Sequence, residues 1–255
     1  MHFRYIFSVI FTFIFTAGLF SQNKIDTKNE DLKAGFLNLF SYSYDFSGGD
    51  LNNRFGNNFH FGIAPSFYFK DSNWSIGTNF DFIFGYNVKE NTFSNLITFD
   101  EQILTTELYL STLATSERGY VAGVFVSKIL PLNIKSKRTG IRLDFGVNYM
   151  STWIRFKDES GTIPQLEQPY VRGYDNMTNG LAFREYIGYQ YIKTDSKANF
   201  NIGIELIQGL TKNIRGYNYE SNTANNSKSL DLLFGLKFGW FLPIYIEDTP
   251  EEVYY

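Results

Sequence analysis

The residue of this chain best suited to acid–base or nucleophilic catalysis is a histidine, His60. The 255 residues hold two histidines, His2 and His60, and His2 lies in an N-terminal segment that we expect to be removed. A histidine beside a hydroxyl and an orienting carboxylate can support nucleophilic catalysis when the three groups converge. Ser43, Ser66 and Asp45 are available, but their spacing does not require them to meet His60. We therefore interpret His60 as a hydrogen-bonded filler and predict no catalytic residues.

Ionic side chains of both signs recur at polar positions of otherwise apolar segments. The residues of this predicted polar network are His60, Asp81, Arg142, Asp144, Arg184, Glu205 and Lys237. Its acidic members could form a proton or metal site. The interspersed cations favour a neutralising salt-bridge network instead, because buried charges are normally paired. We therefore predict no metal and no cofactor.

Composition excludes several other kinds of site. The chain has no cysteine, which excludes disulfides, thiolate metal sites and cysteine nucleophiles. Its 23 Lys and Arg nearly balance 26 Asp and Glu, so we expect no nucleic-acid partner. The glycine-rich segment 48–51 lacks the Lys-Ser/Thr pair of a phosphate-binding loop.

The N-terminus has the three parts of a secretory signal peptide. A positive charge at Arg4 is followed by an apolar run and then by small residues ending at Ser21. The alternative is a membrane anchor, but a spanning helix needs about 20 apolar residues and this run is shorter. We predict that residues 1–21 are a cleaved signal peptide and that 22–34 form a periplasmic segment.

The remaining chain alternates apolar and polar residues with period two, which predicts β-strands. From Leu230 to Ile244 every even position is apolar, while the odd positions include Asp231 and Lys237. The other alternating segments begin near Phe36, Phe59, Trp74, Tyr120, Ile141, Leu181 and Phe200. This gives eight strands.

The connections between these strands alternate in length, which predicts how the strands are ordered. Short links fall at 70–73, 131–140 and 194–198, and long ones at 47–57, 87–119, 157–180 and 212–228. Outer-membrane barrels have short periplasmic turns and longer extracellular loops. We therefore predict an all-β fold, an up-and-down antiparallel transmembrane β-barrel over 35–246, followed by a periplasmic acidic tail at 247–255.

The direction of the two strand faces separates this barrel from a soluble one. Eight strands enclose a space that side chains just fill. Glycine and paired ions suit that space, whereas series of Phe, Leu, Ile and Trp would overfill it. We therefore expect the apolar faces to meet lipid; a soluble barrel with inverted faces is the alternative.

Two long loops carry further predictions. Loop 87–119 is too long and too apolar for a plain connection, so it adds a helix or a hairpin or covers a partner. A hairpin there would raise the strand count to ten. Loop 157–180 contains Tyr170, Arg172 and Tyr174, residue types enriched at interfaces. We treat these three as a partner-binding loop, with packing on its own barrel as the alternative.

Several short segments resemble a family of small outer-membrane barrels of Bacteroidota, over most of the mature chain. They are Gly48-Gly49-Asp50-Leu51, Phe84-Gly85-Tyr86-Asn87-Val88-Lys89-Glu90, Gly173-Tyr174-Asp175 with Asn179-Gly180, and Gly235-Leu236-Lys237-Phe238-Gly239-Trp240 with Leu242-Pro243-Ile244-Tyr245. The resemblance implies no catalytic residues. Such barrels are similar to accessory subunits of envelope machines, such as barrel-assembly or type IX secretion complexes.

These observations together predict a non-enzymatic outer-membrane β-barrel that serves as a structural or interaction subunit of an envelope assembly or secretion complex. Its expected partners are outer-membrane lipid and other envelope proteins. Two alternatives stay open, a lipid- or peptide-modifying enzyme using His60 and a small pore.

Overall fold

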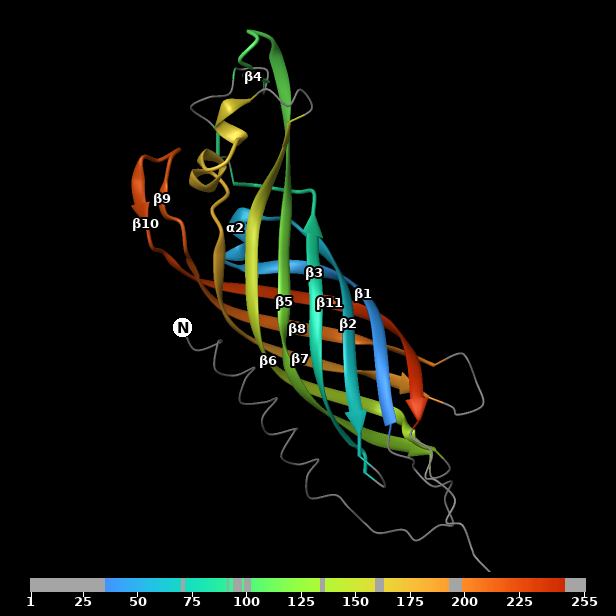
Figure 1. Cartoon of the computed structure of the whole chain (residues 1–255). Coiled ribbons are helices and arrows are strands. Elements are labelled where there is room, and N and C mark those ends of the chain that lie inside the picture. Colours follow the sequence, from blue (N-terminus) through green and yellow to red (C-terminus); the bar gives the residue numbers. More distant parts are fainter. Residues whose placement is uncertain are drawn as a thin grey trace, which may run out of the picture. The chain divides into compact units, whose positions relative to one another are not determined.

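The structure, a computed structural model, describes residues 35–69, 72–90, 92–93, 98, 102–133, 136–158, 163–192 and 199–245 (Figure 1). The predicted signal peptide, the periplasmic segment at 22–34 and the acidic tail at 247–255 lie outside these residues. Among the described residues, no helix is long and apolar enough to cross a membrane.

Eight long strands form one closed ring. They are β1 (Gly35–Gly49), β2 (Asn58–Tyr68), β3 (Trp74–Gly85), β5 (Leu110–Asn133), β6 (Ser136–Asp158), β7 (Thr178–Tyr191), β8 (Phe200–Asn213) and β11 (Lys228–Tyr245). Each strand pairs antiparallel with its neighbours in the chain, and β1 pairs with β11 to close the ring. The predicted up-and-down transmembrane barrel of eight strands is thus confirmed.

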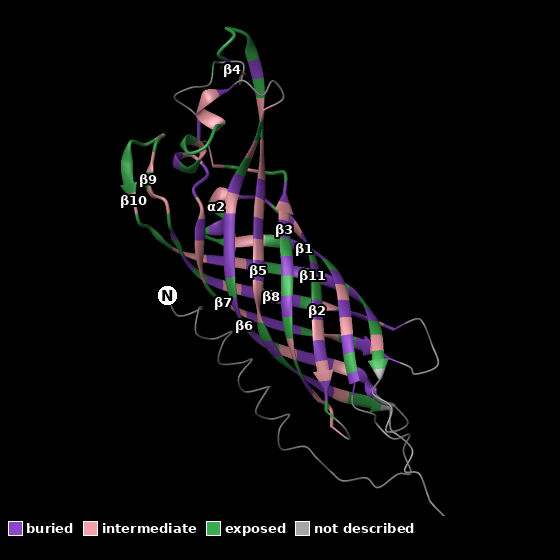
Figure 2. Ribbon diagram, in the orientation of Figure 1, coloured by how far each residue is buried: buried purple, intermediate pink, exposed green. Residues whose placement is uncertain are grey.

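The alternation of the sequence becomes an outward and an inward face (Figure 2). On β3, Phe82 is 38% exposed while Asp81 is 2% exposed, and on β11, Leu236 is 61% exposed while Lys237 is 3% exposed. Aromatic and aliphatic side chains on neighbouring strands extend this outward surface around the ring. Such a continuous apolar belt requires an apolar surrounding, which the bilayer provides.

The interior of the ring, which we call the lumen, holds apolar side chains as well as the expected ions. A layer towards the short turns contains Leu37, Leu39, Ala64, Tyr68, Phe125, Ile129, Ile192 and Phe241. A second layer towards the long loops contains Leu51, Phe55, Ile83, Val121, Met150, Ile154, Ala182, Ile207 and Leu233. The expected glycines and paired ions therefore share the lumen with apolar side chains, and the central ions lie between the two apolar layers.

The first long loop helps to close the lumen. It contains a short helix, α2 (Leu51–Arg54), which begins directly after β1. Leu51 and the following Phe55 are fully buried in the apolar layer near the long loops. Phe55 also forms an isolated bridge with Val88, which ties this loop to the chain beyond β3. The helix thus caps the ring from inside.

The paired strands β5 and β6 are longer than the others, and at the long-loop end they extend beyond the rest of the ring (Figure 1). The expected 87–119 loop is therefore shorter, because β5 begins at Leu110, and the expected 131–140 turn shrinks to the two residues between β5 and β6. A short strand, β4 (Gln102–Leu104), pairs with β5 outside the ring. The predicted hairpin in this loop therefore exists, but it does not bring the barrel to ten strands.

Smaller elements cover the same end. Two 3-10 helices, η1 (Pro164–Leu166) and η2 (Tyr170–Gly173), lie between β6 and β7. A two-stranded hairpin of β9 (Gly216–Asn218) and β10 (Thr223–Asn225) lies between β8 and β11.

Among the charged residues on the outward strand faces, Lys128 and Glu185 are largely buried between their neighbours. Lys128 pairs with Trp74 across β5 and β3, and its ammonium lies 4.8 Å from the centroid of the Trp74 indole, near the short-turn end. Glu185 lies on β7 opposite Phe145 and Leu206, both outward residues, and is 9% exposed. Glu185 was not identified from the sequence as an outward charge.

Candidate functional site

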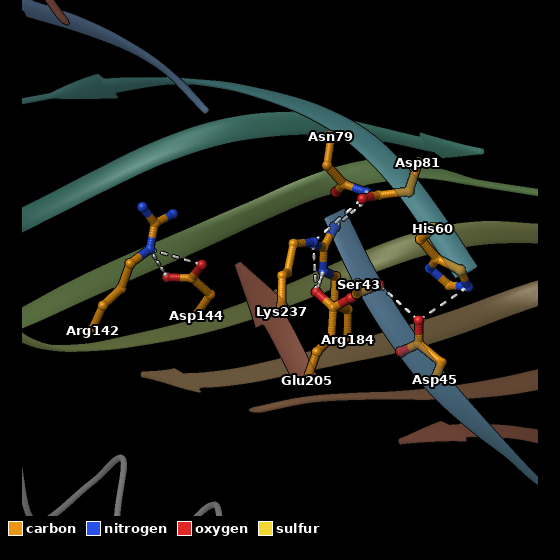
Figure 3. Close-up of polar contacts among 10 residues, drawn as sticks. All are labelled: Ser43, Asp45, His60, Asn79, Asp81, Arg142, Asp144, Arg184, Glu205 and Lys237. Atoms are coloured by element: carbon orange, nitrogen blue, oxygen red, sulfur yellow. Dashed lines mark hydrogen bonds and ion pairs between the residues drawn. The ribbon is translucent and has the colours of Figure 1, made fainter. Parts of the chain in front are cut away.

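A network of four buried ions crosses the middle of the lumen (Figure 3). Asp81 on β3 contacts Arg184 of β7 at 2.7 Å and Lys237 of β11 at 3.3 Å. Glu205 on β8 contacts the same two cations, at 2.5 Å and 2.9 Å. All four side chains are at most 8% exposed. The two acids and two bases bridge opposite sides of the ring, and loss of any one of them would leave a buried charge uncompensated.

Glycines in the facing strands make room for these carboxylates. A Cβ atom at Gly62 would lie 2.0 Å from Asp81 Oδ1 and 3.0 Å from Ser41 Oγ. A Cβ atom at Gly235 would lie 2.0 Å from Asp45 Oδ1. Because these separations are far below van der Waals contact, larger residues there would displace the acids.

A second, separate pair lies towards the short-turn end. Arg142 Nε donates to both oxygens of Asp144, at 2.7 Å and 2.9 Å, and Arg142 Nη1 donates to Gln190 Oε1 at 3.1 Å. The guanidinium carbon also lies 5.5 Å from the centroid of the Phe241 ring. A pocket with room for about one water molecule lies between this pair and the central ions.

His60 lies beside Asp45 at the edge of the central network. Its Nε2 is 3.7 Å from Asp45 Oδ2, too far for a hydrogen bond, and Ser43 Oγ donates to that same oxygen at 2.7 Å. Ser66 instead donates to the Leu37 carbonyl. The serine and the histidine therefore both face the carboxylate. Neither hydroxyl is arranged to pass a proton to His60, so the geometry does not form a nucleophile–base pair.

The structure therefore divides the seven predicted network residues. It brings Asp81, Arg184, Glu205 and Lys237 together, places His60 beside them, and sets Arg142 and Asp144 apart.

Buried acids near the long-loop end join the polar interior as well. Glu117 is fully buried and accepts from Asn58 Nδ2 at 3.2 Å and 3.1 Å. Asp231 accepts from Thr211 Oγ1 at 2.6 Å. The alternation gave a signal for Asp231, since it shares parity with Lys237. Glu117 falls in the segment that was interpreted as a loop, so no signal for it was available there.

A polar cap holds the long loops together above the ring. Arg54 donates to Glu90 at 3.0 Å, to Thr178 at 3.1 Å and to the Asn176 carbonyl at 2.6 Å. Asn176 Nδ2 in turn donates to Glu90 Oε1 at 2.8 Å. Three loops are thereby fixed to one another through one guanidinium.

The three residues of the predicted partner-binding loop have different environments in the same region. Tyr170 is 57% exposed and Arg172 is exposed. Tyr174 stacks on Phe93 with centroids 4.3 Å apart and meets Tyr219 edge-on. Burial raises the pKa of the Tyr174 phenol, and the neighbouring Tyr219 raises it further. Tyr174 therefore packs within the cap, and Tyr170 and Arg172 remain available at the surface.

The most exposed apolar group outside the belt lies at the tip of the β4–β5 hairpin. Leu104, Leu108, Tyr109 and Leu110 are 51%, 78%, 70% and 55% exposed. The Thr105 amide donates to the Tyr109 carbonyl at 2.9 Å, and the Leu108 amide donates to the Thr105 carbonyl at 3.1 Å. We call these four apolar residues the hairpin tip.

Leu108 has an unusual backbone conformation within the hairpin tip. Its φ is +63°, in the left-handed region that glycine and asparagine normally occupy. A leucine there costs about 1 kcal/mol. The hairpin therefore displays a large apolar side chain at a position where the backbone itself favours glycine.

Comparisons with known proteins find similarity in structure alone. No protein-family model and no curated protein sequence matches the chain. Ail, the attachment invasion locus protein of Yersinia pestis, is 10% identical over 82% of this chain and 99% of its own, with a TM-score of 0.41, in its complex with the heparin analogue sucrose octasulfate. The outer membrane protein OprG of Pseudomonas aeruginosa is 11% identical over 85% and 99%, also with a TM-score of 0.41. The resemblance to Bacteroidota barrels stays a prediction.

Proposed function

We propose that this protein is a non-enzymatic outer-membrane β-barrel that binds another envelope protein through its hairpin tip. The observation that carries the proposal is the exposure of Leu104, Leu108, Tyr109 and Leu110 at the end of a hairpin that extends beyond the belt. Apolar groups gathered on a surface away from lipid are typical of binding sites for proteins. A role as an interaction subunit of an envelope assembly or secretion complex accords with this surface.

The backbone at Leu108 strengthens the proposal. Strained conformations persist where the surrounding structure maintains them, and they concentrate at functional positions. Glycine would relieve the strain at this turn, yet the chain has leucine. A requirement for the leucine side chain in binding would account for its presence.

The cap gives this surface a firm base. Arg54, Glu90 and Asn176 link the loops below the hairpin, and Phe93 packs between Phe156 and Tyr174. A preordered surface loses less conformational entropy on binding than a flexible loop does. Tyr170 and Arg172 of the neighbouring loop offer additional contacts of the types enriched at interfaces.

The two alternative functions receive less support from the lumen. His60 is 1% exposed, and neither Ser43 nor Ser66 donates to it, so a catalytic role lacks both substrate access and a proton path. The apolar layers on either side of the ionic network occupy the cross-section that a pore would need.

Replacing Leu108 with glycine tests the proposal. Leu108→Gly relieves the left-handed strain, so the barrel should fold with unchanged or slightly higher stability, while capture of the partner should fall at least tenfold. The measurement is photocrosslinking from a reactive residue placed at Tyr109 in intact cells, followed by mass spectrometry of the crosslinked species. Heat-dependent gel mobility checks folding.

Glu107→Gln is the matched control, because Glu107 is exposed on the same turn but is not apolar. It should crosslink as the unmodified chain does. Equal capture by Leu108→Gly, or crosslinks to lipid alone, would contradict the proposal.

A further inference from the structure

We propose that Asp45, His60 and Glu205 form a binding site for a divalent transition-metal cation inside the lumen. The three side chains come from β1, β2 and β8, and all are at most 1% exposed. One ligand atom from each lies within 4.8 Å of the others. The inference concerns the barrel interior and is independent of the hairpin tip.

The site has polar atoms whose hydrogen-bonding capacity is unused. Among the described residues, neither ring nitrogen of His60 has a hydrogen-bond partner, and the same holds for Asp45 Oδ1 and Glu205 Oε1. Buried polar atoms without partners are costly, and each such atom requires an explanation. The second oxygens of the two acids are already bonded, Asp45 Oδ2 to Ser43 and Glu205 Oε2 to Arg184 and Lys237. The three side chains therefore keep unused ligand capacity for a metal.

The charge of the surrounding lumen favours a cation. Around the site, three buried carboxylates, Asp45, Asp81 and Glu205, face two buried permanent cations, Arg184 and Lys237. Both cations contact Asp81 and Glu205, whereas Asp45 accepts a hydrogen bond from the neutral Ser43. Buried charge must be compensated, and a cation bound beside Asp45 would provide that compensation.

The donor set indicates the class of metal. One imidazole nitrogen and two carboxylate oxygens suit Zn²⁺, Mn²⁺ or Fe²⁺ rather than Cu⁺, which prefers sulfur. Metal–ligand distances of about 2.1 Å would require the three atoms to move together by roughly 1 Å. Ser43 would hold Asp45 in place through the oxygen that the metal does not use, as hydrogen-bonded neighbours of metal ligands commonly do.

The position of the Asp45 carboxylate also depends on a glycine in the facing strand. The carboxylate occupies the space left by Gly235, where a Cβ would come within 2.0 Å of Asp45 Oδ1. Gly235 lies between Asp45 and Glu205 in the pairing of β1, β11 and β8. Its missing side chain therefore allows the two acids to approach each other.

Metal retention by the full chain tests this proposal. The protein is refolded from urea into detergent micelles with ZnCl₂, passed through a chelating resin and a sizing column, and analysed by mass spectrometry for metal. The expected result is about one Zn²⁺ per folded chain, as for a site with three protein ligands. His60→Gln and Asp45→Asn should each lose the metal while keeping heat-dependent gel mobility. Ser43→Ala should weaken retention by about 10- to 100-fold.

Asp231→Asn is the matched control, because Asp231 is an equally buried lumen carboxylate outside the three ligands. It should retain Zn²⁺ fully. If His60→Gln does not fold, the visible spectrum of Co²⁺ bound to the unmodified chain supplies a second readout, and a tetrahedral spectrum is expected. Folded wild-type protein without metal, which would leave a proton as the compensating charge, would overturn the proposal, as would equal retention by Asp45→Asn.

Discussion

At the scale of single residues, the lumen depends on acids and bases that stabilise the barrel together. Asp81 and Glu205 share Arg184 and Lys237, so each charge is compensated by more than one partner. Removing one member would leave an uncompensated buried ion, which usually costs about 3–5 kcal/mol. Space for the acids is part of this arrangement, because Gly62 provides the volume that the Asp81 carboxylate fills.

We expect Gly62→Ala to lower the free energy of unfolding by about 3 kcal/mol, because the new methyl group would push Asp81 away from Arg184 and Lys237. Urea unfolding in detergent micelles measures the change. Gly48→Ala is the matched control, since its Cβ would meet Leu232 Cβ at 3.3 Å, and it should change stability by less than about 1 kcal/mol. Equal effects of the two substitutions would refute the assigned space.

The sequence predicted the ionic residues of the lumen but not their grouping. Period-two alternation placed Asp81, Glu205 and Lys237 on one face, because parity is a local property of each strand. Which acid meets which base depends on strand register and on the curvature of the closed ring. Those are long-range properties, so the separation of Arg142 and Asp144 from the central ions could not be read from spacing.

At the scale of elements, the outward faces of the strands were predictable and the inward faces only in part. Phe82-Ile83-Phe84 and Leu232-Leu233-Phe234 interrupt the alternation with consecutive apolar residues. In the structure, Ile83 and Leu233 point inward and are fully buried. Binary patterning cannot distinguish such an inward apolar residue from an irregular strand, so the two apolar layers of the lumen went unpredicted.

Glu185 places a carboxylate on the lipid-facing side of β7. It lies on β7 between Phe183 and Ile187, in the apolar belt. Carboxylates facing lipid are destabilising, though less so than Lys or Arg. We therefore expect Glu185→Leu to raise the free energy of unfolding in lipid vesicles by about 1 kcal/mol, with Glu185→Gln giving a smaller gain. A loss of stability in Glu185→Leu would show that the carboxylate has a favourable contact in the membrane.

The long β5–β6 hairpin shows why element boundaries were less predictable than element types. Residues 110–116 of β5 extend beyond its pairing with β3, which ends at Glu117, and no lipid-facing requirement enforces alternation there. The segment was therefore interpreted as part of a loop, although β5 and β6 pair continuously from Leu113 to Pro131.

At the scale of the whole molecule, the protein consists of a closed ring with an outer belt, a filled lumen and a cap at one end. An apolar belt faces outward, ions and two apolar layers fill the lumen, and a bonded cap with a protruding hairpin covers one end. The belt and the filled lumen both follow from placing alternating strands between lipid and a narrow interior. The orientation of the two strand faces is the central claim, because the belt, the ionic network and the cation site all depend on it.

Spin labels on β11 test that orientation most directly, since the chain has no native cysteine to replace. Single cysteines at Phe234, Leu236 and Phe238 should give labels that collide frequently with lipid-soluble oxygen in vesicles. Labels at Leu233 and Phe241 should collide rarely with either oxygen or a water-soluble nickel complex. Frequent oxygen collisions at Leu233 and Phe241, with nickel reaching Phe234, Leu236 and Phe238, would contradict the account.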